Sequence, residues 1–140
     1  MKKTALLSLI LFTLPMVFIE CDDQKEETNI PFVYVNFTIY PNTLHFIPDG
    51  GYEYFTGGYK GIIIYRYMHE EFMAYERACP FDPLDDNSRI EVETSGIIAV
   101  DSVCGSRFLL TDGSPIEGPA TVGLKKYRTS YDGYSLIVSN

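Results

Sequence analysis

Two short segments contain the residue types that could hold a soft metal. The first, "ACPFDP", contains Cys79, and the second, "VDSVCGS", contains Asp101 and Cys104. Thiolates bind iron and zinc, and carboxylates can complete a zinc site. The stretch from Val100 to Ala120 reads like half of a metal-binding motif, yet Cys104 is its only soft ligand. The sequence therefore raises the question of whether this is a working metal site or a fold that has lost the chemistry.

Other candidates for catalysis or metal binding favour simpler interpretations. Asp82, Asp85 and Asp86 cluster in one loop, but Ca²⁺ takes six to eight oxygen ligands and the spacing of an EF-hand is absent, so a solvated turn is favoured. The chain has only two histidines, His45 and His69, and neither falls in the two cysteine segments. No nucleophile and base are paired by sequence, so no catalytic residue is predicted.

The composition limits the class of protein. The chain has 140 residues and a net charge of −8, with 11 basic against 19 acidic side chains. This length provides one domain with a single hydrophobic core. An acidic chain repels phosphate backbones, which argues against a nucleic-acid partner.

The N-terminus has the pattern of an export signal. Lys2 and Lys3 precede an apolar run over 5–19, which is short for a membrane span, and Cys21 follows. This pattern resembles a bacterial lipoprotein signal over 1–20 with Cys21 lipidated, and the acidic residues of the tether over 21–30 resemble those of Bacteroidota lipoproteins. We expect a lipid-anchored protein at the outer membrane or cell surface of a diderm bacterium, or one that faces the periplasm. An ordinary secretory signal with an incidental cysteine is the alternative, because Glu20 stands where a small residue is usual.

The remainder of the chain, 31–140, predicts an all-β domain. Apolar and polar residues alternate over 32–40, a β-branched run covers 62–68, and Asp132-Gly133 is a strong hairpin signal. The segment 48–61 is predicted as a turn-rich connection with two glycine pairs. An antiparallel sandwich or small barrel follows from these strands, predicted over 32–40, 62–68, 71–77, 89–93, 96–100, 107–110, 125–131 and 134–139.

The order of motifs over roughly 57–140 resembles the Rieske domain family. "ACPFDP" stands where the family has Cys-x-His, and "DSVCGSRF", followed by a turn with Gly and by "GPA", stands where it has Cys-x-x-His and Gly-Ser-x-Phe. The closing hairpin "LKKYRTSYDGYSLIVS" also matches. The resemblance implies a Rieske-like antiparallel fold in which two ligand loops face each other.

The resemblance also implies four positions for cluster ligands, and most of them have changed. A Rieske [2Fe–2S] cluster needs two thiolates on one iron and two imidazoles on the other. These positions fall on Cys79, Phe81, Asp101 and Cys104. One ligand is kept, one is abolished and two are changed in kind, so no cofactor is expected, with a [2Fe–2S] cluster or another metal as the alternative.

The same resemblance places Cys79 and Cys104 in facing loops. Because exported thiols that lie close together oxidise, it implies a Cys79–Cys104 disulfide in place of the cluster. Two buried free thiols and a redox-active disulfide are the alternatives. Ser106, which resembles the family residue that bonds to a cluster sulfide, is expected to hydrogen-bond to the loop backbone instead.

The predicted function is that of a cell-envelope lipoprotein whose Rieske-like domain has lost its cluster and acts as a non-enzymatic binding or structural module. An electron-transfer protein with an altered metal site is the alternative. The membrane, through Cys21, is the one partner that the sequence indicates.

Overall fold

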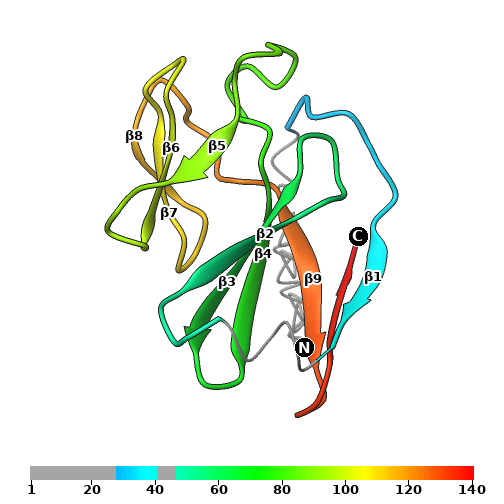
Figure 1. Ribbon diagram of the computed structural model, residues 1–140. Helices are drawn as coiled ribbons and strands as arrows, with labels where there is room; N and C mark the ends of the chain where they lie inside the picture. The colour runs from blue at the N-terminus through cyan, green and yellow to red at the C-terminus, as the bar shows by residue number, and fades with distance from the viewer. Residues whose placement is uncertain (1–27, 41–46) are drawn as a thin grey trace, which may run out of the picture.

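The structure is a computed structural model that describes residues 28–40 and 47–140, and in this part of the chain it is entirely β (Figure 1). All strand pairs are antiparallel. The strands are β1 (Asn36–Ile39), β2 (Tyr52–Phe55), β3 (Ile62–Met68), β4 (Glu71–Glu76), β5 (Ile90–Val92), β6 (Ile98–Asp101), β7 (Arg107–Leu109), β8 (Pro115–Glu117), β9 (Lys126–Tyr131) and β10 (Leu136–Ser139). The all-β class predicted from the sequence is confirmed.

The larger sheet has six strands in the order β1-β10-β9-β4-β3-β2 and curls on itself. Its two edge strands approach each other: the rings of Phe37 on β1 and Phe55 on β2 stack with centroids 6.1 Å apart. Side chains such as Ile62, Phe72 and Val138 fill the interior of this curled sheet. The sheet is therefore close to a barrel.

The smaller sheet has four strands in the order β5-β6-β7-β8 and covers the outer face of β3 and β4. Ile63 and Tyr75 point outward from the larger sheet and pack with Ile90 and Phe108 of the smaller one. The hydroxyl of Tyr75 donates to the carbonyl of Leu110 at 2.9 Å, so this buried polar group is paired across the contact. Burial is therefore required on both faces of β3.

This two-sided burial explains the continuous apolar run over 62–65. Ile62 and Ile64 face the interior of the curled sheet, whereas Ile63 and Tyr65 face the smaller sheet. All four side chains are 3% exposed or less. A strand that is buried on both faces does not alternate between apolar and polar residues.

The predicted hairpins are confirmed, and two short strands, β2 and β8, were missed. The turns at 69–70, 94–96 and 132–133 join β3 to β4, β5 to β6 and β9 to β10, as expected. The prediction of a turn-rich connection over 48–61 was wrong for Tyr52–Phe55, which pairs with Ile62–Tyr65 as β2. The flanking glycine pairs hid this short strand, which the pairing of Gly50 and Gly51 with Arg66 extends.

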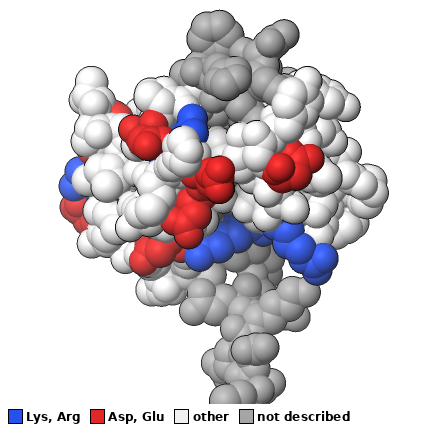
Figure 2. All heavy atoms as spheres, turned by 90° about the horizontal axis from the view of Figure 1, so that it is seen from below, with Lys and Arg blue, Asp and Glu red and all other residues white. Residues whose placement is uncertain are grey.

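The expectations for the signal over 1–20 and for Cys21 lie outside the described residues, as does His45. In the part that the structure describes, there is no helix of the length and apolarity that crossing a bilayer requires. Figure 2 shows one face of the molecule, on which carboxylates form several separate groups; a strip of basic side chains runs below them, and other basic side chains lie apart from this strip.

Candidate functional site

The loop after β4 and the loop after β6 meet at Cys79, Asp101 and Cys104. One ligand-type atom of each residue lies within 4.8 Å of those of the other two. Cys79 follows the end of β4, Asp101 is the last residue of β6, and Cys104 lies in the turn that leads to β7. In the described ranges 28–40 and 47–140, this is the one group of three such residues with that spacing.

The two cysteines are close together and unbonded. Their Sγ atoms lie 3.6 Å apart, whereas a disulfide bond is about 2.05 Å long. Burial raises the pKa of the Cys79 thiol to about 12, although the backbone amides of Phe81 and Asp82 partly oppose this shift. Reduced Cys79 is therefore a neutral thiol at pH 7, and a neutral thiol is a poor nucleophile.

Asp101 is fully buried and serves the loops through hydrogen bonds. Its carboxylate accepts hydrogen bonds from the hydroxyl of Ser88 and, at 2.8 Å, from the amide of Val103. Burial by itself raises the pKa of this carboxyl, but these hydrogen bonds and the Cys79 thiol outweigh it, so the net pKa lies below its usual value. Asp101 is therefore held as a carboxylate that links the two loops.

Ser106 fixes the loop of Cys104 to a distant segment. Its hydroxyl accepts from the amide of Ala120 at 2.9 Å and lies 3.1 Å from the Sγ of Cys104. The amide of Gly105 donates to the carbonyl of Asp101, and Gly105 has a φ of +79°, which favours glycine. Ser106 was expected to hydrogen-bond to the backbone of its own loop, but its backbone partner is the amide of Ala120, which follows β8.

Phe81 does not join the cluster. Its side chain is 55% exposed at the surface of the loop after β4. His69 lies in the turn between β3 and β4, and it is not among the residues that meet at Cys79. The donor set thus has two thiols, one carboxylate and no imidazole, so the residues in the described part of the chain do not fit a Rieske [2Fe–2S] cluster.

The acidic residues of the first loop behave as turn residues. The Oδ1 of Asp85 accepts from the amide of Asn87 at 2.8 Å, while Asp82 and Asp86 are exposed. This arrangement is a turn that aspartate side chains commonly form.

Sequence reasoning missed Glu76, a completely buried carboxylate at the end of β4. It accepts four hydrogen bonds, from the amides of Tyr59 (2.7 Å), Lys60 (2.8 Å) and Ala78 (3.2 Å) and from the hydroxyl of Tyr127 (2.6 Å). Burial and the adjacent Glu76 raise the pKa of Tyr127. Glu76 therefore holds the β2–β3 loop against the core.

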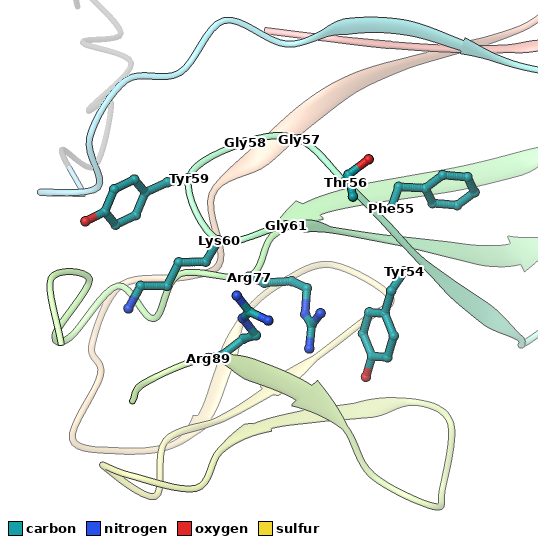
Figure 3. Close-up of a pocket in the computed structure, with 10 residues that line it drawn as sticks. All are labelled: Tyr54, Phe55, Thr56, Gly57, Gly58, Tyr59, Lys60, Gly61, Arg77 and Arg89. Atoms are coloured by element: carbon teal, nitrogen blue, oxygen red, sulfur yellow. The ribbon is translucent and has the colours of Figure 1, made fainter. Parts of the chain in front are cut away.

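The glycine pair Gly57-Gly58 was the feature of the sequence that could have indicated the close contact of this loop with Glu76. A Cβ on Gly58 would lie 2.3 Å from Oε2 of Glu76, and the φ of Gly58 is +63°. The same loop forms one wall of a surface pocket together with Tyr54, Arg77 and Arg89 (Figure 3). The two arginines were not predicted as a pair, because eleven residues separate them in the sequence.

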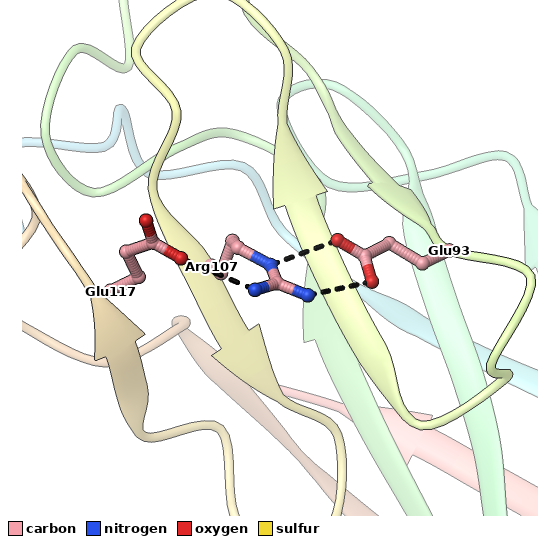
Figure 4. Close-up of polar contacts among 3 residues, drawn as sticks. All are labelled: Glu93, Arg107 and Glu117. Atoms are coloured by element: carbon pink, nitrogen blue, oxygen red, sulfur yellow. Dashed lines mark hydrogen bonds and ion pairs between the residues drawn. The ribbon is translucent and has the colours of Figure 1, made fainter.

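Arg107, within the "GSRF" segment, joins three strands of the smaller sheet (Figure 4). Its Nε and Nη2 each lie 2.9 Å from a different carboxylate oxygen of Glu93, and its Nη1 lies 3.2 Å from Glu117. This bidentate geometry orients the end of β5 and the strand β8 on either side of β7. The contact is architectural.

Comparison with known proteins supports the fold. No family model matches this sequence, and no curated protein matches it. Among solved structures, the chain is similar to the ferredoxin of carbazole 1,9a-dioxygenase from Nocardioides aromaticivorans IC177. The two share 14% identity with a TM-score of 0.51, over 76% of this chain and 97% of that one. The expected Rieske-like fold is thereby confirmed.

Proposed function

We propose that this protein is an exported, lipid-anchored module whose Rieske-like domain carries no [2Fe–2S] cluster and serves in binding or in structure without catalysis. The observation that carries the proposal is the donor set at the two loops. Two imidazoles are required for the second iron, and the corresponding positions are Phe81 and Cys104. A fold does not supply a function when the site residues have changed.

The hydrogen bonds of Asp101 support the same proposal. Where the family has a thiolate that binds iron, this carboxylate is buried and receives hydrogen bonds from Ser88 and Val103. These bonds perform the positioning that a cluster would otherwise perform, since they tie the β4–β5 loop to the β6–β7 loop. The site is therefore consistent with a role in holding the fold together.

Cys79 and Cys104 are proposed to form a disulfide in the oxidising compartment to which the chain is exported. Their Sγ atoms lie 3.6 Å apart as free thiols, about 1.6 Å more than the length of a disulfide bond. The bond would close a loop across 25 positions of the sequence, for which the chain-entropy model gives roughly 3 to 4 kcal/mol of stabilisation. The high pKa of Cys79 argues against rapid thiol exchange.

A bound metal is the second candidate, and one distance favours it. Two thiolates on a single tetrahedral ion with metal–sulfur bonds of about 2.3 Å lie roughly 3.7 Å apart. The observed separation of 3.6 Å matches this value, and Asp101 supplies a third donor. A closed zinc site needs a fourth ligand, which this group does not include.

Metal analysis and thiol mapping on the same anaerobically purified full chain separate the two candidates. The proposal predicts no stoichiometric iron or zinc. It also predicts that Cys79 and Cys104 resist alkylation in denaturant until a reductant is added. One zinc per chain, with both thiols alkylated in denaturant without reductant, would instead establish the metal site.

The lipid anchor has its own test. Replacing Cys21 by serine should move the protein from the membrane fraction to the soluble fraction and remove the lipid mass from its N-terminus. An unchanged membrane association in Cys21→Ser would contradict the anchor.

A further inference from the structure

A basic pocket lies between the β2–β3 loop and the segment that leads into β5. Its volume is about 400 Å³, within the range of small-molecule sites. Three basic side chains and Tyr54 line it beside the glycine loop over 57–61, and none of the described residues that line it is acidic. Figure 3 shows Lys60, Arg77 and Arg89 on the same side of this loop, with Tyr54 next to Arg77.

Arg77 is fixed in the wall of the pocket. Its Nε donates to the carbonyl of Ile90 at 2.9 Å, and its guanidinium carbon lies 3.9 Å from the centre of the Tyr54 ring. The side chain is 12% exposed, and among the described residues its one carboxylate neighbour within ion-pair distance is the largely exposed Glu91, 3.8 Å from Nη2. The Nη1 group makes no hydrogen bond with any described residue, so it is free to bind a ligand.

Arg89 adds a second guanidinium, which has no acidic partner among the described residues. It is exposed, and in the described part of the chain it makes no ion pair. Burial lowers the pKa of Arg77 below its usual value, and the positive charge of Arg89 lowers it further, whereas Tyr54, Glu91 and Glu76 oppose this shift. Two like charges that line one pocket repel each other. An anion between them would remove this repulsion.

The frame around the two arginines is organised in advance. The Nζ of Lys60 donates to the carbonyl of Ser88 at 2.8 Å and to that of Asp85, so it joins the glycine loop to the segment before Arg89. The carboxylate of Glu76 holds the same loop by accepting hydrogen bonds from the amides of Tyr59 and Lys60. A site whose walls are already fixed loses less entropy when a ligand binds.

We propose that this pocket binds the oxyanion group of a small ligand, a phosphate, sulfate or carboxylate, between Arg77 and Arg89. Guanidinium groups match the planar and tetrahedral arrangement of such oxygens. Tyr54 supports the guanidinium of Arg77 by stacking. The site does not use Cys79, Asp101 or Cys104, so it stands whether or not the proposal for the cysteine loops is correct.

The test is a titration of the ¹⁵N-labelled full chain, solubilised in detergent, followed by NMR. Sodium sulfate, sodium phosphate and sodium glucuronate are added separately at constant ionic strength, with glucose as the uncharged control. We expect saturable shifts of the amide signals of Gly57, Gly58 and Gly61 with at least one of the anions and none with glucose. The anion that binds most tightly identifies the source of the oxyanion.

Two variants with the same change make the result specific. Arg89→Gln should weaken the binding at least about tenfold, because a hydrogen bond to a charged group is lost. Arg128→Gln removes an exposed arginine of β9 and should leave the affinity unchanged. Shifts that do not saturate in the native chain, or an equal loss of affinity in both variants, would overturn the proposal.

Discussion

Asp101 and Glu76 are the two acidic side chains that are fully buried in the described part of the chain. Neither faces a basic side chain in an ion pair, and each is satisfied by neutral donors instead. An unpaired buried carboxylate is costly unless hydrogen bonds replace its water. Replacing either residue should therefore destabilise the fold, and the two effects can be measured separately.

Asp101→Asn removes the charge of this buried carboxylate with little change in the size of the side chain. The pKa of Asp101 in the fold lies below its unfolded value of about 3.9, so its contribution to stability is present above about pH 4 and is lost as the pH falls through the folded pKa. The variant should lower the free energy of unfolding by about 1 to 3 kcal/mol at pH 7, since both oxygens of Asp101 accept hydrogen bonds and asparagine replaces one of them with an NH2 group, which only donates. The difference from the native chain should shrink as the pH drops below 4.

Urea unfolding of native chain and variant at several pH values measures this effect. Asp86→Asn, at an exposed position in the neighbouring loop, is the control and should change stability by less than about 0.5 kcal/mol. A constant difference between Asp101→Asn and the native chain from pH 7 down to pH 2 would contradict the assigned role.

Glu76→Gln makes the same change at the other buried carboxylate. Each oxygen of Glu76 accepts two hydrogen bonds, so the new amide group must face at least one backbone N–H donor in either orientation. The expected loss is about 1 to 3 kcal/mol or more, measured by urea unfolding. Glu91→Gln, with a side chain that is 69% exposed, is the matched control, and equal stability of the two variants would count against Glu76 as the support of the loop.

At the scale of elements, the β2–β3 loop links the curled sheet to the basic pocket, and Gly58 is its most constrained position. Gly58→Ala should destabilise the protein by more than the 1 to 2 kcal/mol that a left-handed conformation costs by itself, because the new Cβ would also meet Glu76 and Tyr127.

Gly133→Ala provides the matched comparison for that prediction. Gly133 has a φ of +86°, and a Cβ there would have no neighbour within 4 Å, so only the conformational cost applies. The difference between the two free energies of unfolding measures the close approach to Glu76. Equal losses in the two variants would mean that the loop moves away from Glu76 without cost.

The strands were predictable where local signals were strong, and the contacts between loops were not. The Asp132-Gly133 turn and the alternation over 32–40 identified β9, β10 and β1, although regular pairing of β1 starts only at Asn36. Tyr52–Phe55 lacked such a signal because its pairing depends on β3, which follows after the glycine loop. Strand propensity of a short segment is decided by its neighbours in the sheet.

The residues of the candidate site were likewise predictable only in part. The resemblance carried by "ACPFDP" and "DSVCGSRF" identified the loops in which Cys79, Asp101 and Cys104 meet. The sequence did not reveal that Glu76 is buried, since an acidic residue at the end of a strand is usually exposed. The pairing of Arg77 with Arg89 depends on how the first loop folds back toward β5, and no local pattern encodes it.

At the scale of the whole molecule, the smaller sheet packs on the outer face of β3 and β4, and the cysteine loops lie at the end of the smaller sheet. A Cys79–Cys104 bond would restrict the unfolded chain more than it changes the native contacts. We predict that the oxidised protein is more stable than the reduced protein by roughly 3 to 4 kcal/mol in urea unfolding. Cys104→Ser should show the same stability with and without reductant. If the reductant lowered the stability of this variant as much as that of the native chain, the result would contradict the bond.

Anaerobic reconstitution tests most directly whether the domain keeps a Rieske-like architecture without a cluster. The reduced full chain is incubated with ferrous iron and sulfide, desalted, and analysed for bound iron and for visible absorption. We predict less than about 0.1 iron per chain and no iron–sulfur absorption, because Phe81 and Cys104 stand where imidazoles are needed. About two irons per chain, with the absorption of a [2Fe–2S] centre, would contradict the account.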